Sequence, residues 1–444
     1  MKYTENALNI LTVLSHKGIG KAWVYKNLKG NENTEVILEK LNKKLGGKID
    51  KKEFEKRKNT IIKEINKLNN YCDGIIALGD KDFPQHRGRV NDSEKPVLLF
   101  YKGDIKLLNL ENINISVIGL LNPTIEIIER EKIVVQQFAE RGAVILSGLA
   151  YGCDSIAHKQ AIDSKGKTVA ILPSPLNNIL PKGNRFLAKE IVESGGLLVS
   201  EYLYNHKDLM ELRGRYVERD RLQALFCDLI VLVASYDKDY TGKFDSGARH
   251  AMNYAKKYGI PRAVIYDEKL DKDNPMFSLN RKIIKEEKIM VVNQENCIET
   301  IKREIDKIQK HKILKNYIDK IKSHSEKYHW VGIYLYKDGV LELFPYYIGR
   351  PTPHTKIPID KGICGAAFRE NKTLIVNDVS KDERYLACSI YTKSEIVVPI
   401  RDENGNVLGE IDIDSDYLNA FNESDKEFLE NIAKEIGKIL SNSS

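Results

Sequence analysis

The chain has 444 residues, of which 42% are hydrophobic and 30% charged, and its 70 basic and 63 acidic side chains give a net charge of +7. This length predicts two to four domains, and the mild basic excess permits contact with nucleic acid without requiring it. No apolar run approaches the ~20 residues of a membrane span, no signal-peptide pattern is present, and the six cysteines are too scattered for a disulfide framework, so we expect a cytoplasmic protein.

Residues 1–70 are predicted to be helical. The segments "NALNILTVL" and "TEVILEKLNKKL" carry apolar residues at helical spacing, and the "GIG" of residues 18–20 forms a turn between two helices. The same tripeptide occurs in helix-hairpin-helix modules, where backbone amides meet DNA phosphates, although a structural turn is the favoured interpretation. We assign residues 1–70 to a helical domain of helix-hairpin-helix or SAM-like type.

Residues 71–268 alternate short β-branched segments with helical patterns. Six of these segments are predicted to be buried strands: "NISVIG", "GAVILSG", "KTVAILP", "GLLVSEY", "DLIVLVA" and "IPRAVIYD". Apolar strands that alternate with helices indicate a parallel sheet covered on both faces, and thus an α/β domain of Rossmann-like type. Because such sheets bind ligands at the carboxyl ends of their strands, we expect the loops there to carry the function.

Residues 269–327 are polar and then lysine-rich, which favours a linker that leads into an amphipathic helix. Residues 328–444 are predicted to form an α+β domain with antiparallel strands and a closing helix. Within it, "IRDENGNVLGEI" places Asn-Gly between two apolar segments, which is a strong hairpin signal.

The segment "SGLAYGCDSIAH", residues 147–158, joins a predicted strand to a helix through two glycines. Glycines let the backbone approach a ligand and the amides at a helix N-terminus favour an anion, although a tight turn without a ligand fits the pattern equally well. Asp154 and His158 stand one helical turn apart and could form an acid–base pair, but this spacing more often fixes a helix end.

Further motifs in the same order give residues 75–265 a resemblance to the DNA-processing protein DprA (Smf) family: "DFPQ", "KPVLLFYKGD", "ILPKGNRFL", "GGLLVSEY", "RYVERDRLQAL" and "DSGARHAM". The resemblance implies a Rossmann-like domain that binds single-stranded DNA, assists the loading of a recombinase and forms a homodimer. The residues that it implies for the phosphate pocket are Gly119, Ser147, Gly148, Gly152, Asp154, Lys182, Asn184, Arg215, Arg219, Arg221, Ser246 and Gly247.

Two positions depart from that family's pattern. The family usually has Gly-Ser-Arg after the first strand, whereas this chain reads "VIGLLNPT", so Gly119 is kept and the arginine is replaced by leucine. Asp220 stands where the family favours asparagine. Loss of a bidentate donor and gain of a carboxylate both weaken a phosphate contact, so a small nucleotide is an alternative ligand.

The C-terminal domain has a second group of candidate residues. Asp412 and Asp414 in "GEIDIDS" share one face of a strand by period two, and with Glu395 they could bind a ligand ammonium and manage a proton. Cys364 and Cys388 do not form a metal pattern, so we predict no metal and no cofactor. Core thiols with surface carboxylates are the alternative interpretation.

The motifs "HWVGIYLY", "GICGAAF", "LIVNDV", "YLACSIYTKSEIVVPI" and "GEIDIDS" resemble those of the GAF-domain free methionine-(R)-sulfoxide reductases. The resemblance implies that Cys388 attacks the sulfoxide sulfur, that Cys364 then forms a disulfide with it and that thioredoxin reduces this disulfide. It assigns Glu395, Asp412 and Asp414 to substrate binding, and Trp330 and Tyr334 to an aromatic wall. His354 occupies the position of a further cysteine in that family.

Three functional classes follow from these features. The first is a protein that binds single-stranded DNA or a nucleotide and whose GAF domain senses or reduces a small molecule. The second is a free methionine-(R)-sulfoxide reductase with an accessory Rossmann domain, and the third is a nucleotide-sensing regulatory or defence module. We rank DNA binding first because its motifs cover more of the chain.

Overall fold

The computed structural model describes residues 1–47, 49–238, 247–386 and 389–441. The chain divides into two compact units, Met1–Ile305 and Asp306–Ser444, each of which we describe by itself. Within the described residues, no helix has both the length and the apolar character that a membrane crossing requires.

The first unit begins with four helices, as predicted, and "GIG" forms the turn between the first two. Side chains of Thr4, Asn33 and Asp50 cap three of them by accepting backbone N–H groups. Their apolar faces share one core with Phe100 and Leu172 of the adjoining sheet, so the helices and the sheet form a single unit. The helices are α1 (Glu5–Leu14), α2 (Lys21–Asn27), α3 (Thr34–Leu45) and α4 (Lys51–Asn66).

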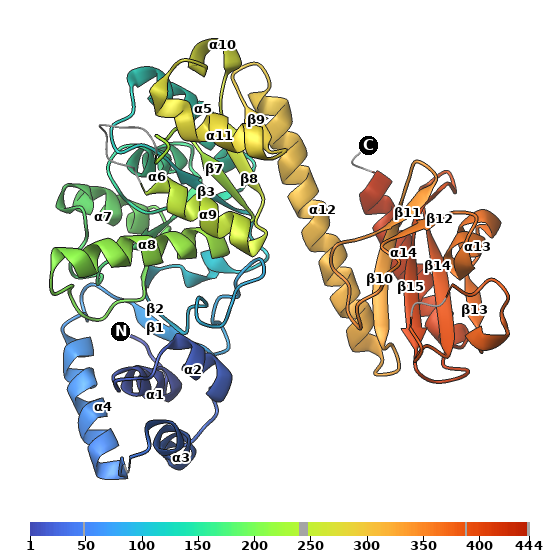
Figure 1. The fold of residues 1–444 in the computed structure, drawn as a ribbon, viewed down its shortest axis with the longest axis horizontal. Coiled ribbons are helices and arrows are strands. Elements are labelled where there is room, and N and C mark those ends of the chain that lie inside the picture. Colours follow the sequence, from blue (N-terminus) through green and yellow to red (C-terminus); the bar gives the residue numbers. More distant parts are fainter. Residues whose placement is uncertain (48, 239–246, 387–388, 442–444) are drawn as a thin grey trace. The chain divides into compact units, whose positions relative to one another are not determined.

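A nine-stranded mixed sheet forms the centre of this unit, in the order β1-β2-β6-β5-β4-β3-β7-β8-β9 (Figure 1). Strands β3 to β9 are parallel, whereas β1 and β2 form an antiparallel edge on β6. The strands are β1 (Gly74–Ala77), β2 (Leu98–Gly103), β3 (Asn114–Ile118), β4 (Val144–Ser147), β5 (Lys167–Leu172), β6 (Leu197–Ser200), β7 (Leu229–Leu232), β8 (Arg262–Ile265) and β9 (Met290–Val292). The strand order reverses between β3 and β7, which is the topological switch point where such sheets bind ligands.

Helices connect the parallel strands, with α5 packed against α6 and α8 packed against α9 (Figure 1). The helices are α5 (Ile125–Glu140), α6 (Cys153–Asp163), α7 (Arg185–Glu193), α8 (Leu209–Leu225), α9 (Ala248–Tyr258), α10 (Glu268–Asp271) and α11 (Ser278–Glu286), with short 3-10 turns η1 (Ile105–Leu108), η2 (Lys182–Asn184) and η3 (Pro275–Phe277). Helix α12 (Cys297–His324) begins in the first unit and ends in the second. The six predicted strands correspond to β3–β8, and the predicted α/β class is confirmed. Four cysteines of this unit, Cys72, Cys153, Cys227 and Cys297, are buried free thiols, as expected.

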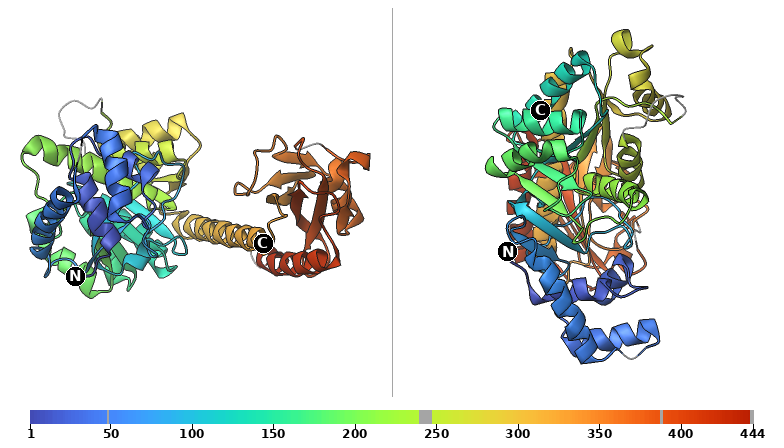
Figure 2. Two further views of the ribbon diagram at one scale, coloured as in Figure 1. Left: turned by 90° about the horizontal axis from the view of Figure 1, so that it is seen from below. Right: turned by 90° about the vertical axis from the view of Figure 1, so that its left-hand side faces the viewer.

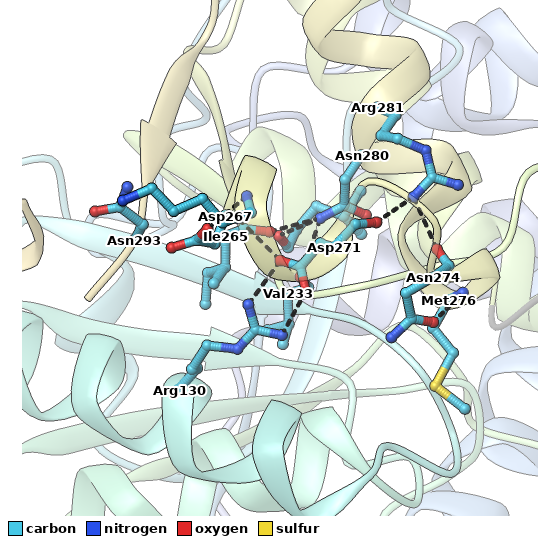
Figure 3. A network of polar contacts seen from close by, with 12 residues as sticks. Arg130, Val233, Ile265, Asp267, Asp271, Asn274, Met276, Asn280, Arg281 and Asn293 are labelled. Atoms are coloured by element: carbon cyan, nitrogen blue, oxygen red, sulfur yellow. Dashed lines mark hydrogen bonds and ion pairs between the residues drawn. The ribbon is translucent and has the colours of Figure 1, made fainter. Parts of the chain in front are cut away.

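The structure differs from the sequence analysis over residues 269–296, which we assigned to a linker. Here α10, η3, α11 and β9 belong to the first unit, and β9 extends the parallel sheet beside β8. The polar side chains that suggested a linker are structural: Asp271 binds Arg130 of α5 at 2.6 and 3.0 Å, and buried Asn280 donates to the carbonyls of Val233 and Ile265 (Figure 3). Segment α10–α11 is thereby fixed over the carboxyl ends of β7 and β8.

The second unit contains a six-stranded antiparallel sheet in the order β12-β11-β10-β15-β14-β13. One face of the sheet packs against α14, visible in red in Figure 2, and against apolar side chains of α12 such as Ile318. The opposite face meets α13 in a smaller core. The elements are β10 (Trp330–Lys337), β11 (Val340–Leu343), β12 (Lys356–Pro358), α13 (Gly362–Glu370), β13 (Leu374–Val376), η4 (Val379–Lys381), β14 (Ser394–Arg401), β15 (Val407–Ser415) and α14 (Glu423–Ser441). The predicted Asn-Gly hairpin joins β14 to β15, with Gly405 at φ 83°.

Candidate functional sites

The glycine-rich loop between β4 and α6 closes on a carboxylate of its own chain. The backbone N–H groups of Gly148 and Ala150 donate to Oδ2 of Asp154 at 3.1 and 3.3 Å, and Asp154 is 7% exposed. Gly152 has φ 72°, and a Cβ there would lie 2.3 Å from the carbonyl oxygen of Leu120. The amides of Gly148 and Ala150, which could otherwise bind an anion, therefore already bind Asp154. Position 152 requires glycine because the backbone of Leu120 lies so close to it.

Arg219 lies directly on this loop. A Cβ on Gly148 would lie 1.0 Å from Nη1 of Arg219, and the guanidinium is 3.6 Å from Asp154 and 3.2 Å from Asp220. The acid–base pair considered for Asp154 and His158 does not form, because Nδ1 of buried His158 lies 2.6 Å from Oγ1 of Thr168. Burial, with a smaller contribution from Arg219, lowers the pKa of His158 to about 3.

The other two predicted arginines are also buried and paired. Arg215 donates to Glu211 and to the carbonyl of Tyr204, and it stacks on the ring of Tyr202. Arg221 pairs with Glu201, which also binds Lys21 at 3.3 Å. Burial of Glu201 opposes ionisation, but these two cations outweigh it and lower the pKa of this carboxyl. Arg215, Arg219 and Arg221 are only 8%, 5% and 3% exposed, so protein covers most of each side chain, and their contact with a phosphate stays a prediction.

The remaining predicted residues of this site brace the loop or lie beside it. Asn184 donates to the carbonyls of Leu149 and Ala150 at 2.9 and 3.1 Å, and Oγ of buried Ser147 donates to the carbonyl of Val117. Gly119 lies against Cys153, and Gly247 is the N-cap of α9. Lys182 is exposed on η2, and Ser246 lies outside the described residues.

Sequence reasoning identified Lys182 but missed three further exposed side chains, Tyr151, Arg185 and Phe186, on the segments that follow β4 and β5. Tyr151 is 51% exposed and lies against Gly183, which follows the exposed Lys182 in the sequence, and Phe186 is 87% exposed and follows the exposed Arg185. We call these four residues the aromatic–basic rim. The sequence does place an aromatic residue within or next to each motif expected to bind phosphate, Tyr151 in "LAYG" and Phe186 in "KGNRF", and this could have identified both rings.

The second unit gathers its acidic residues on the inner face of the sheet, below α13. Glu410, Asp412 and Asp414 alternate along β15, and Glu395 lies opposite Asp414 on β14. All four are buried, and burial raises their pKa values. Repulsion within the group adds to this for Glu395, Glu410 and Asp412, whereas repulsion from Asp416 adds to it for Asp414, whose pKa is raised to about 7. The shared face of Asp412 and Asp414 is as predicted, whereas Glu410 was missed although the same alternation in "GEIDIDS" includes it.

Cys364 of α13 points at these carboxyl groups. Its Sγ lies 4.0 Å from Oε1 of Glu395, and one donor atom each of Cys364, Glu395 and Asp412 lie within 4.8 Å of one another, a spacing that a metal ion could bridge. Burial and the surrounding carboxylates raise the pKa of the Cys364 thiol well above its usual value. The Cys364 thiol therefore stays protonated in this environment and is a poor nucleophile.

A small pocket opens beside Asp414, and its volume of about 10 Å³ accommodates roughly one water molecule. Trp330 forms part of its wall, and its Nε1 donates to the carbonyl of Arg350 at 3.1 Å. Tyr334 donates its hydroxyl to the carbonyl of His354 at 2.8 Å. The predicted aromatic wall is thus close to the acidic face, whereas Cys388 lies outside the described residues.

The two units match different protein families. A model for DNA recombination-mediator protein A matches residues 74–302, more than half of the chain, and a GAF domain model matches residues 311–440. DNA processing protein DprA of Streptococcus pneumoniae is 31% identical over 190 residues, which are 43% of this chain and 64% of that protein. Free methionine-R-sulfoxide reductase of Saccharomyces cerevisiae is 42% identical over 120 residues, which are 26% of this chain and 66% of that protein. The chain thus covers slightly less than two thirds of each relative.

Among solved structures, one describes the single-stranded DNA binding mode of DNA processing protein A from Helicobacter pylori. It has 25% sequence identity and a TM-score of 0.40, and the match covers 51% of this chain and 99% of that chain.

Proposed function

Because the chain belongs to the DNA recombination-mediator protein A family, we propose that its first unit binds single-stranded DNA at the carboxyl ends of β4 and β5. The aromatic–basic rim carries this proposal: Tyr151 and Phe186 offer exposed rings, and Lys182 and Arg185 offer exposed cations, on the β4–α6 loop, on η2 and at the start of α7. Proteins that bind single strands without sequence preference combine base stacking with a basic surface. In this proposal the buried arginines hold the loops in place and do not contact phosphate.

The proposal is tested by fluorescence anisotropy of a labelled oligothymidylate with the full chain at low salt. Phe186→Ala and Tyr151→Ala should each weaken binding by about 5- to 150-fold, since one stacked base contributes about 1–3 kcal/mol. Lys182→Gln should reduce the salt dependence by about one phosphate contact. Tyr71→Ala is a matched control, because Tyr71 is 50% exposed and lies just before β1.

Wild-type protein without affinity for the oligonucleotide would contradict DNA binding, and so would equal losses in Tyr71→Ala and the rim variants. Tight binding of a mononucleotide that the rim variants abolish would favour a nucleotide ligand at the same rings.

We propose further that the second unit binds and reduces free methionine-(R)-sulfoxide. The buried carboxyl groups of Glu395, Asp412 and Asp414 beside Trp330 support this, because they can accept the substrate ammonium next to an apolar wall for the side chain. The high pKa of Cys364 favours Cys388 as the attacking thiolate and Cys364 as the second thiol.

The proposed reaction transfers the sulfoxide oxygen to protein sulfur. The Cys388 thiolate attacks the sulfoxide sulfur, a proton from the carboxyl groups reaches the oxygen, and methionine leaves as Cys388 becomes a sulfenic acid. The Cys364 thiol then condenses with the sulfenic acid, which releases water and forms a disulfide. An external dithiol, for which we propose thioredoxin, reduces that disulfide to two thiols.

Chromatographic detection of methionine, after incubation of the full chain with the sulfoxide and dithiothreitol, tests this reaction. Cys388→Ser should abolish product, Cys364→Ser should still release one methionine per chain without reductant, and Cys297→Ser in the first unit should behave like wild type. Wild-type protein that releases no methionine would contradict catalysis.

The remaining proposals rest on the family alone. We propose that the chain forms a homodimer and contacts a recombinase, which sedimentation of the full chain, alone and with the recombinase, would test.

A further inference from the structure

The lining of the pocket in the second unit includes one arginine, Arg350, to which the proposed reaction assigns no role. Among the pocket-lining residues that the structure describes, Arg350 is the only lysine or arginine, and it shares the lining with Asp414 and Trp330. The backbone of Arg350 is positioned by the Trp330 indole, which donates to its carbonyl.

The Arg350 guanidinium is held by a carboxylate and an aromatic ring from two other loops. It donates to both oxygens of Asp416 at 2.9 and 2.6 Å, and it stacks 4.4 Å from the ring centre of Tyr391. The side chain of Arg350 is nevertheless 48% exposed, and that of Asp416 is 23% exposed. Exposed ion pairs contribute little net stability, so another carboxylate can replace Asp416 at small cost.

The pocket volume of about 10 Å³ is too small for an amino acid, so entry of a ligand requires a change at the mouth. A free amino acid carries an ammonium and a carboxylate on the same carbon, and the pocket offers a buried acidic face and one guanidinium for these two groups. Bidentate carboxylate recognition is the geometry that arginine favours.

We propose that Arg350 is a specificity-determining residue that exchanges Asp416 for the α-carboxylate of the substrate, and so restricts the pocket to free amino acids over peptide-linked or amidated ones. This inference rests on the proposed binding of methionine-(R)-sulfoxide by the second unit. It gives a role to the guanidinium that lines this pocket together with the carboxyl groups of Asp414 and Asp416.

Calorimetric titration of the full chain with methionine-(R)-sulfoxide and with its α-amide tests the inference without depending on turnover. The relevant quantity is the ratio of the amide Kd to the free-acid Kd. In Arg350→Gln this ratio should fall about tenfold, because a charge-assisted contact that only the acid can form is removed. Arg350→Lys should give an intermediate ratio, since it keeps the charge without the planar fork.

Two further variants separate this role from a structural one. Arg401→Gln should leave the ratio unchanged, because Arg401 binds Asn371 at the opposite end of β14 from Glu395. Asp416→Asn should tighten binding of the free acid, since it removes the competing carboxylate. If wild-type protein binds methionine-(R)-sulfoxide and the ratio is unchanged in Arg350→Gln, the role of Arg350 is wrong but the proposed substrate stands. Failure of wild-type protein to bind either probe would overturn the proposed substrate and the inference together.

Discussion

The ion pair between Arg130 and Asp271 provides a quantitative test of how segment α10–α11 is held on the first unit. The two side chains are 9% and 2% exposed and form two hydrogen bonds, and Asp271 also accepts the N–H of Asp267 (Figure 3). Removal of one partner of a buried pair costs about 3–5 kcal/mol, because the other charge is left buried. Asp271→Asn keeps an acceptor for Asp267, so we expect the lower end, about 3 kcal/mol.

The chain contains two tryptophans, Trp23 in the first unit and Trp330 in the second, which allows each unit to be followed separately. In a Trp330→Phe background, urea unfolding monitored by Trp23 fluorescence reports the free energy of unfolding of the first unit. The double variant Arg130→Met/Asp271→Asn removes the orphaned charge and should recover about 2 kcal/mol of the loss.

Glu129→Gln is the matched control for this experiment. Glu129 pairs with Lys132 on the same helix, but both side chains are exposed, so its loss should change the free energy of unfolding by less than about 0.5 kcal/mol. If Asp271→Asn costs no more than Glu129→Gln, or if the double variant is no more stable than the single one, the argument from burial is wrong.

Three further predictions concern the two candidate sites. Gly148→Ala should destabilise the first unit by about 1–3 kcal/mol in the same urea assay, since the buried Arg219 guanidinium must move away from the added Cβ. Gly20→Ala, with no atom within 4 Å of the added carbon, should cost less than about 1 kcal/mol. In a Trp23→Phe background, the free energy of unfolding of the second unit should fall as the pH rises from about 4 through about 7. The pKa of Asp414 is raised in the folded state, so over this range the folded state holds a proton that the unfolded state has released. Constant stability over this range would contradict the raised pKa of Asp414. Glu410→Gln should make that pH dependence shallower without lowering stability at pH 7, because neither oxygen of this buried carboxyl has a nitrogen or oxygen hydrogen-bond partner; a loss above about 1 kcal/mol would show that the charge is needed.

The elements that depend on local pattern were predictable from the sequence. Strands β3–β8 are continuous apolar segments, and the β14–β15 hairpin follows from Asn-Gly at its turn. Strands β1, β2 and β9 were missed. The edge strands β1 and β9 are short, and all three strands obtain their order from pairing with strands distant in the sequence, β1 with β2, β2 with β6 and β9 with β8, which no local window contains.

The first site was less predictable than the fold for a related reason. Arginine beside a glycine-rich loop is compatible with a phosphate contact or with an internal ion pair, and the choice depends on partners such as Asp154 and Glu201, which lie 65 and 20 positions away from Arg219 and Arg221. Exposure, which identifies Tyr151 and Phe186, is likewise a property of the folded chain. In the second unit, strict alternation along β15 fixed the positions of Asp412 and Asp414 in advance.

Gly148, Asp154 and Arg219 depend on one another. The missing side chain of Gly148 leaves room for the Arg219 guanidinium, and Asp154 accepts the N–H of Gly148 and lies 3.6 Å from Arg219. Selection for a foldable protein would keep all three even in a descendant that had stopped binding any ligand, and loss of one would expose the other two to compensating change. The presence of these three residues is therefore evidence of a folded domain and not of a bound ligand, whereas Tyr151 and Phe186, which the fold leaves exposed, would be free to change once binding is no longer under selection.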